Sequence, residues 1–143
     1  MKLQFASDLH LENHKIGELI ITPHPDADIL ILAGDIAHGA DAIMLFADWP
    51  VPVLYVPGNH EYYHRDFTQA RKVLKHTASQ GNVQVLDNDV IEISGVRFLG
   101  CTLWSDYKLN PQDSQKEAMA AAELSIPDHQ HIYHNGGVFT ASD

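Results

Sequence analysis

The sequence predicts an α/β fold whose layers pack around a partly parallel sheet, and three observations lead to this prediction. First, residues 28–33 and 51–56 are near-continuous apolar runs, the pattern of strands buried on both faces of a parallel sheet. Second, segments with helical patterning alternate with these runs. Third, polar residues that can bind metal ions or transfer protons follow each early strand directly.

The first half of the chain supplies the parallel part of the predicted sheet. Residues 2–6 predict a short first strand, and the two apolar runs predict the second and third strands. A short helix is predicted over residues 40–48. A longer helix is predicted over residues 65–78, because one stripe of that segment gathers the apolar residues Phe67, Ala70, Val73, Leu74 and Ala78.

The second half of the chain predicts a strand meander, a helix and a tail. Residues 83–86, 90–93 and 96–99 are short apolar runs joined by turn residues, and the last two are expected to form a hairpin. A helix is expected to open at Pro111, with Asp113 in its first turn, and to run to about Leu124. The tail, residues 125–143, is polar and rich in His and Gly, which predicts weak structure.

Composition narrows the class of protein. The 143 residues suffice for one domain, so residues 1–143 are predicted to form a single domain. A formal net charge of −10 disfavours nucleic acid as a partner, because such binding needs Lys and Arg to displace counterions. The single cysteine, Cys101, permits no internal disulfide, and the N-terminus has no signal-peptide pattern. With no apolar run of membrane-spanning length, these features predict a cytoplasmic protein without a membrane partner.

Five polar side chains follow the first three predicted strands. Asp8 and His10 come after the first strand, Asp35 after the second, and Asn59 and His60 after the third. Adjacent parallel strands are about 4.8 Å apart, so these groups are expected to converge. Each residue alone has an ordinary structural explanation, as a cap, a turn residue or a surface histidine. Together they predict a mixed nitrogen and oxygen site that suits Mn, Fe or Zn better than Cu(I).

These motifs resemble those of the calcineurin-like metallophosphoesterase superfamily. The similarity lies in the order and spacing of Asp8-Leu9-His10, Gly34-Asp35 and Gly58-Asn59-His60-Glu61, which match its D-x-H, G-D and G-N-H-[DE] motifs. The stretch from Gly100 to Tyr107 is also similar to one found in a bacterial group of these enzymes. The resemblance covers nearly the whole chain and implies a layered α/β sandwich of the metallophosphoesterase type.

The resemblance also implies a role for each motif residue. Asp8 and His10 would bind a first divalent metal ion, Asp35 would bridge two ions, and Asn59 would bind the second. His60 would be the catalytic residue that assists the leaving group, and Asn59 and His60 would contact the substrate. The implied reaction is hydrolysis of a small phosphomonoester or phosphodiester by a hydroxide that bridges the two metal ions. Support or packing is favoured over a direct role for the neighbouring Glu61, Tyr62 and Tyr63.

Two motifs of that superfamily are not found in residues 1–143: a lone His after a further strand, and a G-H-x-H motif. The domain is therefore expected to be incomplete at its C-terminus. Truncation, ligands from a second subunit or from water, and lost catalysis all explain this pattern. The alternative function is accordingly a non-catalytic metal-binding or protein-interaction module on the same scaffold. Substitution by the tail histidines, His129, His131 and His134, is less favoured. Apolar surface left uncovered would favour a homo-oligomer.

Overall fold

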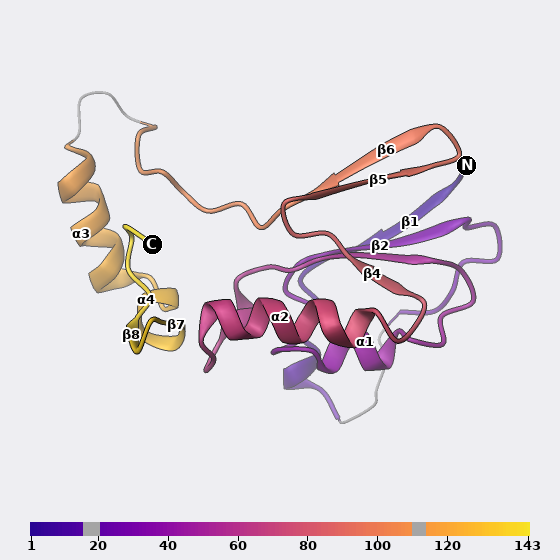
Figure 1. The fold of residues 1–143 in the computed structure, drawn as a ribbon, viewed down its shortest axis with the longest axis horizontal. Coiled ribbons are helices and arrows are strands. Elements are labelled where there is room, and N and C mark those ends of the chain that lie inside the picture. The colour runs from indigo at the N-terminus through magenta and orange to yellow at the C-terminus, as the bar shows by residue number, and fades with distance from the viewer. Residues whose placement is uncertain (16–20, 110–113) are drawn as a thin grey trace.

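Four parallel strands form the centre of the molecule. The structure is a computed structural model, and it describes residues 1–15, 21–109 and 114–143 (Figure 1). The sheet has the order β1 (Leu3–Ala6), β2 (Ile29–Ala33), β3 (Val53–Val56) and β4 (Val83–Val85), with every neighbouring pair parallel. Ala6 pairs with Leu32, and Ala33 with Val56, so the first three strands end at the same edge. The α/β prediction is confirmed.

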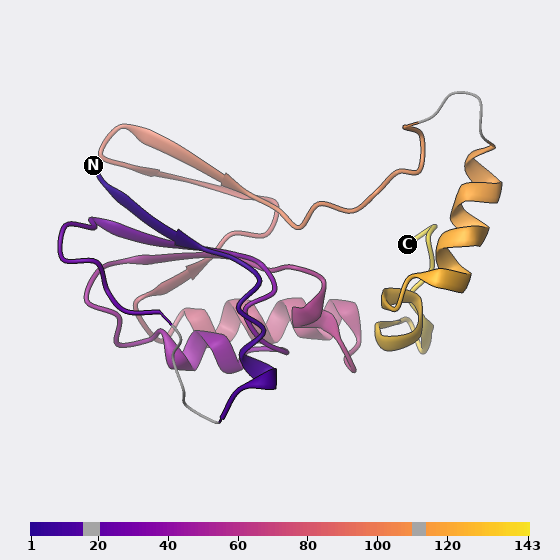
Figure 2. The same cartoon turned by 180° about the vertical axis from the view of Figure 1, so that it is seen from behind.

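Two helices cover one face of this sheet. The helices α1 (Asp41–Leu45) and α2 (Phe67–Ala78) lie on the same side in both views (Figures 1 and 2). Asp66 begins α2 as its N-cap, since its carboxylate accepts a hydrogen bond from the backbone N–H of Gln69 at 3.0 Å. The buried stripe of α2 is Ala70, Leu74 and Ala78, and it packs into the main core with Leu30, Leu32, Val53 and Tyr55 of the sheet. The predicted helix over 40–48 is shorter than expected.

A hairpin covers part of the other face. Strands β5 (Asp89–Ile93) and β6 (Val96–Gly100) pair antiparallel around Ser94 and Gly95, which both have left-handed φ angles of 51° and 77°. Their apolar side chains, Ile91, Ile93 and Phe98, pack against the buried Ile29, Leu54 and Leu86. The hairpin prediction is confirmed. The prediction that residues 83–86 belong to a meander is wrong, because α2 crosses over the sheet and returns the chain to pair β4 with β3.

The C-terminal part gathers beyond the amino end of α2 (Figures 1 and 2). It contains α3 (Gln115–Ser125), the one-turn helix α4 (Asp128–His131) and the short strands β7 (Tyr133–His134) and β8 (Gly137–Val138). The prediction of a weakly structured tail is wrong for these residues. Backbone hydrogen bonds to the segment before α2 hold them: His64 N–H to His131 C=O, and Tyr133 N–H to Arg65 C=O. The predicted helix start at Pro111 and Asp113 lies outside the described residues.

Among the described residues, none of the helices combines the length and the apolar character that crossing a bilayer requires.

Candidate metal centre

The loops that follow β1 and β2 are joined to each other by backbone hydrogen bonds. The N–H of Asp8 donates to the C=O of Gly34 at 3.0 Å, and the N–H of His10 donates to the C=O of Asp35 at 3.0 Å. Next along the chain, Leu11 N–H donates to Ile36 C=O at 2.8 Å. The two strand ends are thereby fixed in register with each other beyond the sheet.

Three of the predicted ligands lie together at this point. The ligand atoms of Asp8, His10 and Asp35 are all within 4.8 Å of one another, with Asp8 exposed and the other two half-buried. Two carboxylates and one imidazole form a donor set that suits a borderline or hard divalent cation such as Mn²⁺, Fe²⁺ or Zn²⁺. The residues present therefore fit the metal ions that the sequence predicts.

All three of these residues have left-handed backbone conformations. Their φ angles are 54° for Asp8, 45° for His10 and 54° for Asp35. Such angles are uncommon for residues with a side chain and cost roughly 1–3 kcal/mol each, so they persist only where surrounding contacts enforce them. Here the hydrogen bonds between the two loops do so, and the turns bring the three side chains to one place.

The loop after β3 approaches Asp35 so closely that only glycine fits. A Cβ added at Gly58 would lie 2.2 Å from Oδ1 of Asp35 and 2.5 Å from its backbone nitrogen. The same Oδ1 accepts a hydrogen bond from the backbone N–H of His60 at 3.0 Å. The G-N-H motif is therefore bound to the G-D motif through the Asp35 carboxylate.

Glu61 holds the loops from beneath. Its side chain is fully buried and accepts four hydrogen bonds, from Tyr55 Oη–H at 2.5 Å and from the N–H groups of Gly58 (2.7 Å), Ile36 (2.9 Å) and Asp35 (3.2 Å). Burial raises the pKa of Glu61 above its ordinary value, although these donors act to lower it. The expectation that Glu61 supports the site fits this arrangement.

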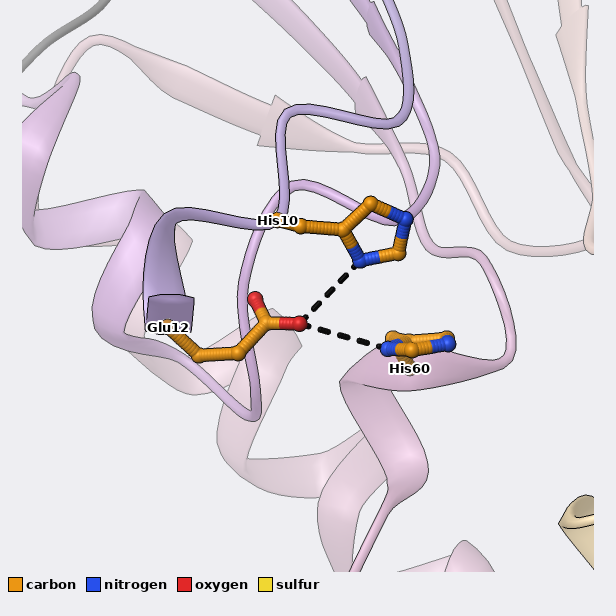
Figure 3. Close-up of side chains that lie close together, drawn as sticks. All are labelled: His10, Glu12 and His60. Atoms are coloured by element: carbon orange, nitrogen blue, oxygen red, sulfur yellow. Dashed lines mark hydrogen bonds and ion pairs between the residues drawn. The ribbon is translucent and has the colours of Figure 1, made fainter. Parts of the chain in front are cut away.

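His60 begins the one-turn 3-10 helix η2 (His60–Tyr62) and its ring is surrounded by other rings. It stacks on Tyr63 with ring centroids 4.3 Å apart, and it meets His10 edge-on at 4.4 Å. Figure 3 shows that His10 and His60 both direct a ring nitrogen toward the carboxylate of Glu12, on the 3-10 helix η1 (Leu11–Asn13). The Nδ1 atoms of His10 and His60 lie 3.1 and 3.3 Å from Oε1 of Glu12.

Asn59 is held by a residue from the far end of the chain. Its Nδ2–H donates to Oδ1 of Asp128 at 2.7 Å, and Asp128 also accepts a hydrogen bond from the Tyr63 hydroxyl at 2.8 Å. The pKa of the Tyr63 phenol is raised far above its ordinary value. The largest cause is burial, and the hydrogen bond and the negative charge of Asp128 add to it. Because the amide nitrogen is engaged with Asp128, the side-chain oxygen of Asn59 stays available for a ligand.

Five further histidines lie near the ring of Tyr63 or in the tail. His38, His64 and His131 lie beside Tyr63, with ring centroids 5.7, 6.2 and 5.3 Å from it, and so extend the ring cluster. His129 is buried against the C=O of Phe139, and His134 pairs with Asp143. Among the described residues, no tail histidine shares a cluster close enough to hold one metal ion.

The sequence prediction missed Glu12 and Asp128. Glu12 completes an alternating Asp8-x-His10-x-Glu12 pattern, and this pattern could have identified it. Asp128 is 69 residues from Asn59 and gives no local signal.

Comparisons with known proteins give a family match and a viral relative. The family model described as calcineurin-like phosphoesterase matches residues 1–137. An uncharacterized protein of Acanthamoeba polyphaga mimivirus is 31% identical over 125 residues, an alignment that covers 73% of this chain and 44% of the viral protein. The chain thus spans less than half the length of that curated relative.

Proposed function

This chain belongs to the calcineurin-like phosphoesterase family, and from that premise we propose that it hydrolyses a small phosphate ester in a metal-dependent reaction. The observation that supports this most directly is the cluster of Asp8, His10 and Asp35, with ligand atoms within 4.8 Å of one another. His60 lies beside this cluster, its ring centroid 4.4 Å from that of His10.

The proposed cofactors are two divalent ions, Mn, Fe or Zn. Asp8, His10 and Asp35 would hold one ion, and Asp35 and the side-chain oxygen of Asn59 would hold the other. When bound, such ions activate water and neutralise charge on the phosphoryl oxygens. The chain contributes a rigid arrangement of its own: Glu61 fixes Asp35 and Gly58, and Asp128 fixes Asn59.

His60 is the proposed proton donor. In the reaction water would give up one proton to the solvent and its oxygen would bond to phosphorus. The bond from phosphorus to the ester oxygen would break, and the leaving oxygen would take a proton. Since Nδ1 of His60 faces Glu12, its other ring nitrogen, Nε2, is the one available to the leaving oxygen. Asn59 and His60 are thus proposed to contact both the substrate and the supporting network.

The test uses p-nitrophenyl phosphate and bis(p-nitrophenyl) phosphate with added Mn²⁺. We expect turnover that EDTA abolishes and that His60→Ala or Asp35→Asn reduces at least about 100-fold, a typical size for loss of an acid or a metal-bound carboxylate. His76→Ala, at an exposed site on α2, is the matched control and should retain full activity. Lack of metal-stimulated turnover in the pure wild-type protein would refute the proposal for this chain.

The non-catalytic alternative is not favoured. A binding module needs the metal ligands but has no use for His60, which lies beside them with its Nδ1 facing the carboxylate of Glu12. Metal binding without turnover in the same assay would support that alternative instead.

We further propose that the protein self-associates. Three apolar side chains are largely exposed: Phe5 on β1 (78%), Leu99 on β6 (76%) and Leu103 in the segment that follows β6 (89%). Exposed apolar surface of this kind favours association. Light scattering at several concentrations should give a mass above that of the 15.9 kDa monomer, and a monomer throughout would contradict this. The cytoplasmic location stays a prediction from the single cysteine.

A further inference from the structure

Glu12 lies between the proposed metal ligand and the proposed acid. The side chain of Glu12 is only 15% exposed, and one oxygen, Oε1, faces three imidazole rings. This oxygen lies 3.1 Å from Nδ1 of His10 and 3.3 Å from Nδ1 of His60 (Figure 3). It also lies 3.7 Å from Nε2 of His38. One carboxylate therefore contacts two histidines to which the proposed reaction gives different tasks.

The contacts of this carboxylate determine what the rings must do. The Nδ1 atoms of His10 and His60 both lie within hydrogen-bond distance of the same oxygen, Oε1. An ionised carboxylate only accepts hydrogen bonds, so the Nδ1 atoms that face it must each carry a proton. Its second oxygen, Oε2, is buried without a partner among the described residues, so Oε1 alone makes the side-chain contacts.

A proton on Nδ1 defines the other end of each ring. In a neutral imidazole one nitrogen donates and the other accepts, and the hydrogen bond made by one nitrogen sets the state of the other. His10 would therefore present the lone pair of Nε2, which a metal ion requires. The ring of His60 would be held with Nε2 directed away from Glu12 and toward the leaving oxygen. His60 would act as the proton donor in its doubly protonated form, in which Nε2 carries a proton as well as Nδ1.

We propose that Glu12 is a shared positioning residue that fixes the tautomer and the ring orientation of both His10 and His60. The catalytic benefit of this role rests on the proposed phosphoesterase function. The effect of Glu12 on the tautomers and ring orientations can be measured without turnover. Glu12 couples the two halves of the site, because a change at one carboxylate disturbs a metal ligand and the acid together.

The first test reads the ring tautomers directly in the metal-free protein. Proton–nitrogen correlation spectra of the imidazoles at about pH 8, where ordinary histidines are neutral, should show His10 and His60 with the proton on Nδ1. In Glu12→Ala both rings should shift toward a proton on Nε2, whereas the control Glu92→Ala, on the exposed side of β5, should leave them unchanged. If Glu12→Ala does not fold, Glu12→Leu keeps a similar volume and removes both acceptor oxygens. Unchanged tautomers in a folded Glu12 variant would overturn the proposal.

The second test measures turnover and metal content together. With Mn²⁺, Glu12→Ala should lower kcat/KM for aryl phosphates about 10–100-fold, the usual effect of removing a carboxylate that orients a ligand. The loss should grow as the leaving group becomes more basic, since His60 protonates that group, and a general loss of structure would not produce this trend. The Glu92→Ala protein should match the wild type.

The outcomes separate the two proposals. An active wild type with an unaffected Glu12→Ala variant refutes the positioning role and leaves the phosphoesterase function standing. An inactive wild type refutes the function, and the tautomer spectra still decide the role of Glu12. The ligand atoms of His10, Glu12 and His60 also lie within 4.8 Å of one another, so Glu12 could itself bind a metal ion. In that case Glu12→Ala would lose a full equivalent of bound metal, and the tautomers in the metal-free protein would not change. This pair of results would make Glu12 a metal ligand and overturn the positioning role.

Discussion

Replacing Glu61 with glutamine tests whether the loops of the site depend on one buried carboxylate. Glu61 accepts four hydrogen bonds, two at Oε1, from Tyr55 and Ile36, and two at Oε2, from Gly58 and Asp35. Glutamine has nearly the same shape but one acceptor oxygen, and its NH2 group must face donors at the other position. The substitution therefore isolates the acceptor pattern from the packing.

The magnitude follows from the number of donors that lose their acceptor. Each buried donor left unsatisfied costs about 1–3 kcal/mol. If the NH2 group replaces Oε2, the N–H groups of Gly58 and Asp35 are both left without a partner. If it replaces Oε1, the Tyr55 hydroxyl can rotate to accept, and only the N–H of Ile36 is left. One or two such donors give a loss in the free energy of unfolding of about 1–6 kcal/mol, with about 3 kcal/mol as the central expectation.

Urea denaturation followed by circular dichroism measures this loss. With a slope of about 1–3 kcal/mol per molar urea, the expected midpoint decrease is about 1–3 M. Glu92→Gln, exposed on β5, is the matched control and should unfold with the wild type. A midpoint for Glu61→Gln within about 0.3 M of the wild type would refute the reasoning, because the acceptor pattern would then contribute nothing measurable.

The pH dependence of this difference has a definite sign. Burial raises the pKa of Glu61 above its ordinary value of 4.5, so the folded protein holds the proton more tightly than the unfolded chain. The stability from that proton is complete below the ordinary pKa and is lost as the pH rises through the raised value. Glutamine does not titrate, so the gap between wild type and variant should narrow as the pH rises above the ordinary pKa of 4.5. A gap that widens over this range would contradict the direction of the shift.

Three further substitutions test separate parts of the structure. Gly58→Ala would place a Cβ 2.2 Å from Oδ1 of Asp35, so we expect a loss of about 1–3 kcal/mol and Mn²⁺ binding weakened at least about tenfold by calorimetry. Asp128→Ala should lower the pKa of the Tyr63 phenol toward its ordinary value in a spectrophotometric titration, and no shift would exclude the contact. Trp49→Phe removes a buried Nε1–H that has no partner among the described residues, so it should cost less than about 1 kcal/mol in unfolding, and a loss above about 2 kcal/mol would reveal a missed partner.

The strands of the parallel sheet could be predicted because their apolar runs are local. The ends of β2 and β3 lie within two residues of the predicted limits, since burial on both faces leaves no alternation to confuse the pattern. The strand β4 was harder. Val83 and Val85 are buried and Gln84 is exposed, which is also the alternation of an antiparallel strand. Its partner is decided by the crossover of α2 and not by its own residues.

The tail could not be predicted for a related reason. The helix α4 has four residues, too few to be stable from local propensity. Its conformation depends on contacts with the segment before α2, including the bridge between Asp66 and Tyr133. Those contacts join residues more than sixty positions apart in the sequence, and the residue pattern of the tail does not predict them.

The residues of the candidate site that directly follow strands could be predicted from the sequence. The residues that lie elsewhere could not. Asp8, His10 and Asp35 lie at ends of parallel strands, so the topology brings them together once the sheet is known. Glu12 reaches His60, 48 residues away, because the left-handed turn at His10 leads directly into η1. A reversal of this kind depends on backbone angles that side-chain patterns do not reveal.

The backbone strain of the site has a consequence for metal binding. Three left-handed residues, Asp8, His10 and Asp35, cost roughly 1–3 kcal/mol each. The three hydrogen bonds between the loops and the four accepted by Glu61 contribute about 1 kcal/mol each, which is of the same size as the strain. The strained turns are therefore maintained by the protein itself. Because no metal ion is needed to offset them, the free energy of metal binding is available for affinity and not consumed in ordering the loops.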